Sequence, residues 1–299
     1  MAKDIESLEA SRDRRAEIQM KYGFIPTSII RAEKNKLQAR DDEAETRNYY
    51  STTNVTSKIV AHDVFDVSGQ SCRGKMGALS GYPQNVGRYL VKMYSSEGDT
   101  ILDPFAGHNS RMELVYKLGR NYIGYDISSK FMAMNRKVAA DLLGKTQSAL
   151  FPINQSIQLI EDDARNIIVK MPVDMVLTSP PYWDLEYYGS ERGQLGNLKT
   201  YAAFIGGLEC IVGKCYDSLR VGGFCCWSIN DFRRDGVFYS YHASVISLFE
   251  AVGLRLHDII IVDLGYPIGA AFASQLEGQK RTAKRHEYIV VGQKKDFPL

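Results

Sequence analysis

From about residue 86 onward, short apolar runs alternate with longer stretches in which apolar residues recur every three or four positions. The short runs have the length and composition of buried strands, and the longer stretches have the period of helices with one buried face. We expect strands at 100–104, 121–126, 157–162, 173–178, 223–229, 255–263 and 286–293. We expect helices at 86–95, 110–119, 128–143, 200–220 and 240–252. This alternation predicts an α/β protein whose mostly parallel sheet is covered by helices on both faces.

The last two predicted strands follow a different rule. Between 255–263 and 286–293 the chain has a Gly-rich, basic segment without a helical pattern. A parallel connection needs a crossover, which is usually a helix, so these two strands should pair antiparallel.

The first 75 residues differ from the rest of the chain. Residues 1–50 carry ten basic and ten acidic side chains, and their pattern predicts helices at about 3–20 and 31–48. Residues 51–75 have the composition of a connecting loop. We therefore expect a peripheral N-terminal extension over 1–75 and one main domain over 76–299.

The composition limits the class of protein. A chain of 299 residues with 44% hydrophobic residues can bury a full core, and a net charge of +2 restricts any surface for a polyanion to a local patch. Five cysteines without CxxC spacing indicate buried thiols in a reducing compartment and disfavour a zinc site. Because residues 1–20 are charged throughout and no long apolar stretch follows, we expect a cytoplasmic protein without a membrane partner.

The first chemical signal lies where the strand at 100–104 ends. Asp103-Pro104-Phe105-Ala106-Gly107, here called the Gly loop, places an acid and a glycine between this strand and a helical pattern. Parallel sheets present cofactor loops in this way at their carboxyl edge. Asp126 and Asp163 end the next two strands. An adenosyl ligand with an amino-acid end needs close backbone approach, an acceptor for the ribose hydroxyls and an acceptor for the adenine amine, which Gly107, Asp126 and Asp163 offer in chain order.

Other interpretations of these residues are available. Each carboxylate alone could be a helix cap, but three at successive strand ends favour the pocket. A dinucleotide site is also possible, because an acid downstream of a Gly loop is part of its signature. The loop lacks GxGxxG, however, and a dinucleotide site leaves the second signal unexplained.

The second signal is Thr178-Ser179-Pro180-Pro181-Tyr182-Trp183, here called the Pro-Pro loop, which follows the strand at 173–178. An exocyclic amine on an aromatic base is a poor nucleophile, because its lone pair is drawn into the ring. The Ser179 hydroxyl and the Pro180 carbonyl, which Pro181 helps to hold outward, can accept hydrogen bonds from both N–H groups and so free the lone pair. Tyr182 offers a stacking face, and paired aromatics suit a base flipped out of a duplex. An ordinary Pro-Pro turn is the simpler alternative.

With the Gly loop first and the Pro-Pro loop second, the chain resembles the DNA amino-methyltransferases over about 82–294, most of all the stand-alone modification methylases of phages and mobile elements. The resemblance implies the methyltransferase fold, with a seven-stranded, mostly parallel sheet and an antiparallel last strand, and S-adenosylmethionine as cofactor. It assigns catalysis to Ser179, Pro180, Pro181 and Tyr182. It assigns cofactor contacts to Pro83, Gln84, Asp103, Phe105, Ala106, Gly107, Asn109, Asp126, Ile127, Asp163, Ala164 and Thr178. His108-Asn109 stands where the family usually has a second glycine.

The resemblance also bears on the target. Serine in the first catalytic position is commoner in family members that make N4-methylcytosine, and aspartate in those that make N6-methyladenine. We therefore expect N4-methylcytosine, with N6-methyladenine as the alternative. The loop has no Pro-Cys nucleophile, which disfavours methylation of a ring carbon. An RNA or protein amine methyltransferase, and a nucleic-acid-binding protein that does not use the cofactor, remain open.

Double-stranded DNA is the expected partner. Its contacts are assigned to Trp183, Arg233, Arg234, Lys280, Arg281, Lys284 and Arg285. Basic clusters bind phosphates, although a solvated charge run explains each cluster about as well. No recognition domain of the usual size is visible, so a short target or help from residues 1–75, as a DNA-recognition or dimer element, is implied. We expect a monomer or a homodimer without a metal.

Overall fold

The computed structural model describes residues 14–32, 82–107, 111–147, 155–185, 188–268, 277–282 and 284–296. The predicted helix at 31–48, apart from its first two residues, and the predicted loop at 51–75 lie outside these ranges. Of the predicted helix at 3–20, residues 14–20 are described and are helical.

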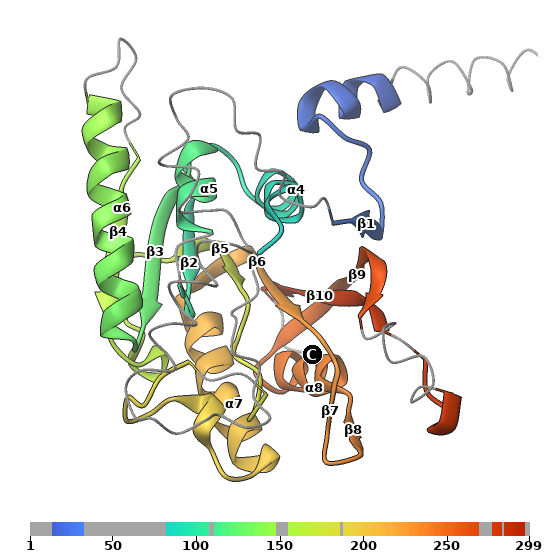
Figure 1. Cartoon of the computed structure of the whole chain (residues 1–299). Coiled ribbons are helices and arrows are strands. Elements are labelled where there is room, and N and C mark those ends of the chain that lie inside the picture. The colour runs from blue at the N-terminus through green and yellow to red at the C-terminus, as the bar shows by residue number, and fades with distance from the viewer. Residues whose placement is uncertain are drawn as a thin grey trace, which may run out of the picture.

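Within the described residues, eight strands form one sheet in the order β1-β9-β10-β6-β5-β2-β3-β4 (Figure 1). Their bounds are β1 Ile29–Arg31, β2 Thr100–Asp103, β3 Asn121–Asp126, β4 Ile157–Glu161, β5 Val173–Thr178, β6 Leu219–Ile229, β9 Leu254–Ile268 and β10 Lys284–Lys294. β10 runs antiparallel to both β6 and β9, and the other neighbouring pairs are parallel. The seven predicted strands and the antiparallel last strand are confirmed.

Helices cover both faces of the sheet (Figure 1). They are α4 Gln84–Tyr94, α5 Met112–Lys117, α6 Ser129–Gln147, α7 Tyr201–Ser218 and α8 Tyr241–Ala251. Successive strand residues point to opposite faces, so a buried strand needs apolar side chains at every position. In β5, Val176 packs into the core beneath α7 and α8, whereas Met175 and Leu177 pack into the core beneath α4, α5 and α6. This explains the continuous apolar run that predicted the strand.

Part of the N-terminal region belongs to the sheet. β1 pairs in parallel with β9, with Ile29 opposite Ile261. The Phe24 ring stacks on Tyr89 of α4 at 4.4 Å between centroids, and the Tyr89 hydroxyl donates to the Thr27 carbonyl at 3.0 Å. Residues 24–32 therefore contact the main domain, with β1 as an edge strand of its sheet, and a pairing of three residues is too short a pattern to recognise in the sequence. The boundary near residue 75 lies outside the described residues and stays a prediction.

The order of strands brings the two signalled loops together. β2 and β5 are hydrogen-bonded neighbours near the middle of the sheet, with Leu102 opposite Val176. Parallel neighbours end at the same edge, so the Gly loop after β2 and the Pro-Pro loop after β5 lie beside each other.

Candidate active site

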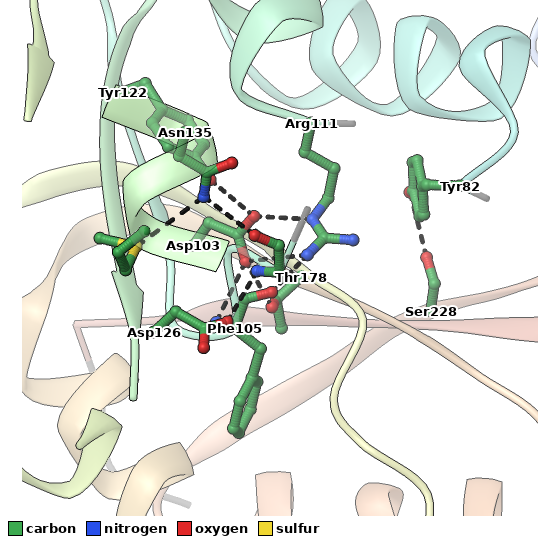
Figure 2. Close-up of polar contacts among 11 residues, drawn as sticks. Tyr82, Asp103, Phe105, Arg111, Tyr122, Asp126, Asn135, Thr178 and Ser228 are labelled. Carbon is green, nitrogen blue, oxygen red and sulfur yellow. Dashed lines mark hydrogen bonds and ion pairs between the residues drawn. The ribbon is translucent and has the colours of Figure 1, made fainter. Parts of the chain in front are cut away.

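Asp103, at the end of β2, ties the Gly loop to the Pro-Pro loop (Figure 2). Its carboxylate is fully buried, and Oδ1 accepts a hydrogen bond of 2.6 Å from the Thr178 hydroxyl. Oδ1 also accepts one from the Phe105 amide at 3.2 Å, and Oδ2 accepts one from the Tyr122 hydroxyl at 2.9 Å. One buried carboxylate thus fixes the two loops relative to each other. Asp103 and Thr178 point at one another, and a cofactor contact by either side chain stays a prediction.

Arg111, just before α5, neutralises this carboxylate (Figure 2). Its Nε donates to Asp103 at 2.7 Å, and the guanidinium also donates to the Phe105 carbonyl at 2.5 Å. Burial alone would lower the pKa of Arg111, but the charge of Asp103 raises it above its usual value, so the guanidinium stays charged. It also lies 5.2 Å from the centre of the Tyr82 ring. Sequence reasoning missed Arg111, because no local pattern marks the partner of a buried acid.

Two further groups hold the end of the Gly loop. Gly107 has a positive φ of 54°, which suits glycine, and its amide donates to Asp126 Oδ2 at 2.8 Å. Asn135 of α6 is fully buried and donates from Nδ2 to the Gly107 carbonyl at 2.9 Å. The Oδ1 atom of Asn135 has no hydrogen-bond partner among the described residues. Asn135 was also missed, since a lone asparagine in a helix gives no signal.

Asp126 ends β3 as predicted and faces the Gly loop. Its two oxygens accept from the amides of Gly107 and Ser128, both at 2.8 Å, which leaves further acceptor capacity on each oxygen. Burial raises the pKa of the carboxyl from 3.8 to about 6; the two amides lower it, and the nearby charge of Asp103 adds to the rise.

This pKa predicts a pH dependence for ligand binding. If Asp126 accepts hydrogen bonds from a ribose diol, only its ionised form binds well, so affinity for S-adenosylmethionine should be constant above pH 7. It should fall as pH drops through about 6, approaching about tenfold per pH unit below that value. Calorimetric titration from pH 5 to 8 measures this. An Asp126→Asn variant serves as control: it should bind S-adenosylmethionine more weakly at pH 7.5, and its affinity should not fall as the pH drops through 6. If the affinity of the variant still fell near pH 6, another group would be responsible for the pH dependence.

Asp163, after β4, is already engaged by a neighbour. It caps the short 3-10 helix Ala164–Asn166, accepting from the Arg165 amide at 2.9 Å, and forms an ion pair with the Arg165 guanidinium. Burial would raise the pKa of Asp163, but the hydrogen bonds and charge of Arg165 lower it below the usual value. Its carboxylate is thus committed to Arg165, and an adenine contact stays a prediction.

The segment after the Pro-Pro loop covers this part of the site. The Gly193 carbonyl accepts from Arg165 at 3.2 Å, and its φ is 109°. A Cβ at Gly193 would lie 2.8 Å from Asp163 Oδ2 and 3.0 Å from Ile127 Cδ1. Only glycine fits where this segment crosses the ends of β3 and β4.

Gly193→Ala should therefore both strain the backbone and push the segment away from Asp163 and Ile127. We expect a loss of about 1–3 kcal/mol in the free energy of unfolding, together with weaker binding of S-adenosylmethionine. Chemical denaturation and calorimetry measure the two effects. Gly206→Ala is the matched control: Gly206 lies in α7 with no neighbouring atom within 4 Å of the added Cβ, so alanine should stabilise the protein slightly. Equal behaviour of the two variants would contradict the prediction.

Those of the remaining predicted cofactor residues that the structure describes lie at the same edge. Pro83 and Gln84 are half-buried at the start of α4. Ala106, in the Gly loop, is buried and donates its amide to the Tyr125 carbonyl at 2.8 Å. Ile127 and Ala164 directly follow Asp126 and Asp163. Asn109 and its neighbour His108 lie outside the described residues.

The Pro-Pro loop presents its polar atoms at the edge of the sheet. Neither the Ser179 hydroxyl nor the Pro180 carbonyl makes a hydrogen bond within the described part of the chain. The Pro181 carbonyl accepts from the Tyr241 hydroxyl at 3.3 Å. The Tyr182 ring packs edge-on against Tyr241 at 6.0 Å and against Phe232 at 6.3 Å. Tyr182 is thus held in an aromatic cluster by near-perpendicular ring contacts, and its stacking role stays a prediction.

Two of the residues predicted to contact DNA, Trp183 and Arg234, bond to other groups of the protein. The Trp183 indole N–H donates to the Leu198 carbonyl at 2.7 Å. Arg234 pairs with Asp184, directly after the Pro-Pro loop, at 2.7 Å. Both residues therefore brace the loop, and their contact with DNA stays a prediction. Arg233 is exposed.

The basic cluster that was expected before the last strand is divided: Lys284 and Arg285 are the first two residues of β10, and their side chains do not form one surface. Lys284 donates to the Asp231 carbonyl at 2.5 Å, and burial lowers its pKa to about 8. Arg285 points to the opposite side and makes a two-pronged ion pair with Asp263, at 2.7 and 2.9 Å. Lys280 and Arg281 precede the strand. The alternation of side chains along β10 separates residues that look continuous in sequence, and their contact with DNA stays a prediction.

The described residues also bear on metal binding and membrane insertion. Among the residues that the structure describes, no group of three or more His, Cys, Asp or Glu could hold a metal ion. No described helix is long and apolar enough to cross a membrane. Cys215, Cys225 and Cys226 are buried free thiols as expected, but Cys210 is exposed on α7, and Cys72 lies outside the described residues.

Comparison with known proteins identifies sequences similar to this chain. A family model described as DNA methylase matches residues 20–137, which include the Gly loop but not the Pro-Pro loop. The Type II methyltransferase M.MjaI of Methanocaldococcus jannaschii is 44% identical over 46 residues, which is 15% of each chain. The Type II methyltransferase M.SmaI of Serratia marcescens is 30% identical over 158 residues, 46% of this chain and 49% of that one. The chain thus spans about half or less of the length of these curated relatives.

A solved structure, TrmN from Thermus thermophilus, aligns with a TM-score of 0.47 and 16% identity over 71% of this chain and 49% of that one. This likeness is too weak to bear on function.

Proposed function

Because the chain belongs to the DNA amino-methyltransferase family, we propose that it transfers a methyl group to the exocyclic amino group of a flipped-out DNA base, with N4 of cytosine as the expected target. The family model ends before the Pro-Pro loop, and the curated relatives are matched over only part of their length. The activity of the whole chain, its DNA substrate and its base are therefore all parts of the proposal.

The hydrogen bond between Thr178 and Asp103 carries the proposal. Methyl transfer needs the donor carbon and the acceptor nitrogen side by side, in line and without water between them. The Thr178 hydroxyl and the Asp103 carboxylate, 2.6 Å apart and buried, join the Gly loop to the Pro-Pro loop. Such an adjacent pair of loops supports a reaction between a ligand on one loop and a substrate on the other.

The cofactor of this family is S-adenosylmethionine, whose sulfonium supplies the methyl group. Several features fit this molecule. Among the described residues, the nearest atom to a Cβ added at Gly107 is the Phe105 carbonyl oxygen at 3.8 Å, which leaves room on that side for a close approach to the backbone. Asp126 has acceptor capacity for ribose hydroxyls. Asn135 Oδ1, buried beside the loop and without a partner in the described part of the chain, is an acceptor suited to a cationic ligand.

The Pro-Pro loop supplies the catalytic groups of the proposal. Ser179 and Pro180 would accept hydrogen bonds from the two N–H groups of the target amine and leave its lone pair aimed at the methyl carbon. Tyr182 would hold the base plane. Both acceptors are neutral and too weakly basic to keep a proton, so the proton that the nitrogen loses after transfer must pass to solvent. This arrangement lowers the barrier by positioning and polarisation rather than by strong general base catalysis.

Mass spectrometry of nucleosides tests the proposal. Purified protein is incubated with duplex DNA of mixed sequence and labelled S-adenosylmethionine, and the DNA is digested to nucleosides. N4-methylcytosine is expected, because the neutral acceptor Ser179 suits the cytosine amine. A signal only at N6 of adenine would reject the base but keep the reaction. Labelling of tRNA or protein without labelling of DNA would reject the DNA substrate. If calorimetry detected no cofactor binding, the enzyme assignment would fail.

A further inference from the structure

A small hairpin projects beside the Pro-Pro loop, outside the main sheet (Figure 1). Its strands are β7 Phe232–Arg234 and β8 Val237–Tyr239, paired antiparallel with Arg234 opposite Val237. The turn residues Asp235 and Gly236 have positive φ values of 49° and 82°, as a tight two-residue hairpin turn requires. Three residues per strand give a reach of about 10 Å, so the hairpin is short and stiff.

The base of the hairpin is anchored to the proposed catalytic loop. The Phe232 ring packs edge-on against Tyr182 at 6.3 Å and stacks on Tyr239 across the hairpin at 5.2 Å. Arg234 forms an ion pair with Asp184 at 2.7 Å. The orientation of the hairpin is therefore coupled to the position of Tyr182.

The hairpin exposes apolar side chains on β8, whereas its turn presents the exposed carboxylate of Asp235. Val237 is 53% and Phe238 is 50% exposed, and Phe238 is the aromatic residue among the large apolar side chains exposed in the described part of the chain. The Arg233 guanidinium lies 4.9 Å from the centre of the Phe238 ring. A single exposed apolar residue is ordinary, but here Phe238 and Arg233 lie directly opposite each other and so place an aromatic ring and a cation on one face of a rigid support.

We propose that this hairpin enters duplex DNA and that Phe238 fills the space in the base stack that the flipped target base leaves. The inference rests on the proposed function. A two-stranded ribbon fits the major groove, and Arg233 carries the charge that attracts phosphates. Apolar side chains placed between base steps compensate for lost stacking. The anchoring through Phe232 and Arg234 would place the wedge at a fixed distance from Tyr182, as expulsion of one base next to its pocket requires.

The target sequence is first identified on DNA methylated by the unsubstituted protein. Phe238→Ala is then compared with the parent on an oligonucleotide duplex with a normally paired target, and on the same duplex with an abasic site opposite the target. On the paired duplex kcat/KM should fall about tenfold or more, the scale of one lost aromatic-base stack. With the abasic site, where little pairing opposes flipping, the variant should come within about threefold of the parent. Phe238→Trp should retain activity on both duplexes.

A second readout does not need turnover. A 2-aminopurine in place of the target base should become more fluorescent when the unsubstituted protein binds and flips it out, and less so with Phe238→Ala. Val221→Ala is the matched control, because Val221 is 47% exposed at the start of β6, on the opposite edge of the sheet from the Pro-Pro loop. It should match the parent in every assay.

The inference is overturned if Phe238→Ala leaves kcat/KM on the paired duplex unchanged. It is also overturned if the substitution lowers kcat/KM equally on both duplexes, since that would mean a general DNA contact. Affinity for S-adenosylmethionine should be unchanged in all variants, and a change would also overturn it. Normal methylation by the parent with either negative result leaves the proposed function intact. A parent that neither methylates DNA nor changes the fluorescence overturns both.

Discussion

Tyr182→Ala is expected to lower methylation of duplex DNA by about a hundredfold or more, while affinity for S-adenosylmethionine stays within about twofold. The ring is proposed to hold the flipped base plane, an interaction that matters only once the target has left the stack. Ser179→Ala should give a loss of similar size, because it removes one acceptor for the target amine while leaving the buried Thr178 to Asp103 bond in place. Single-turnover kinetics and calorimetry separate the chemical step from cofactor binding.

The matched control is Tyr182→Phe. It keeps the ring and its edge contacts with Phe232 and Tyr241, so most activity should remain. Loss of cofactor affinity in Tyr182→Ala, or equal losses in the alanine and phenylalanine variants, would contradict the stacking role. Thermal denaturation of each variant identifies any loss that comes from unfolding of the aromatic cluster.

Arg111→Met should destabilise the protein by about 3–5 kcal/mol, because it leaves the fully buried carboxylate of Asp103 without its cation. Binding of S-adenosylmethionine should weaken in parallel, since the same guanidinium holds the Phe105 carbonyl of the Gly loop. Chemical denaturation gives the free energy of unfolding, and calorimetry gives the affinity.

An exposed ion pair provides the comparison for this result. Arg220 pairs with Asp174 at 2.6 Å, but its side chain is 49% exposed, so Arg220→Met should cost only about 0–1 kcal/mol. The double variant Asp103→Asn with Arg111→Met removes both buried charges, keeps an oxygen acceptor for the Thr178 hydroxyl, and should recover part of the stability lost in Arg111→Met. Similar costs for the two single variants would mean that the buried pair does not hold the loops.

The family resemblance and the positions of the Gly loop and the Pro-Pro loop followed from local patterns. Strands 100–104, 121–126 and 173–178 were predictable because each is a short apolar run that ends in a polar turn, and β2, β3 and β5 confirm them. The same local pattern shows which residues end each strand. Because parallel strands end at the same edge of a sheet, Asp126 and the Pro-Pro loop could be expected at one edge.

The role of individual carboxylates could not be read in this way. Asp103 and Asp163 look equivalent to Asp126 in sequence, yet Asp103 is enclosed by Arg111 and Thr178, and Asp163 is held by Arg165. Whether a carboxylate faces a ligand or a neighbouring side chain depends on groups that approach from elsewhere in the chain. For Asp103, one such group is the hydroxyl of Thr178, which lies on a different strand, β5.

By itself, then, the sequence determined the order of strands and helices, the two loops and the residue types they present, because these depend on periodicity and turn chemistry within short windows. Only the tertiary structure decided that β1 joins the sheet beside β9 and that Lys284 and Arg285 point to opposite sides of β10. It also decided that the hairpin of β7 and β8 packs against Tyr182 through Phe232. Each of these depends on strand neighbours and side-chain directions set by distant segments, and no local pattern of polar and apolar residues encodes such a partner.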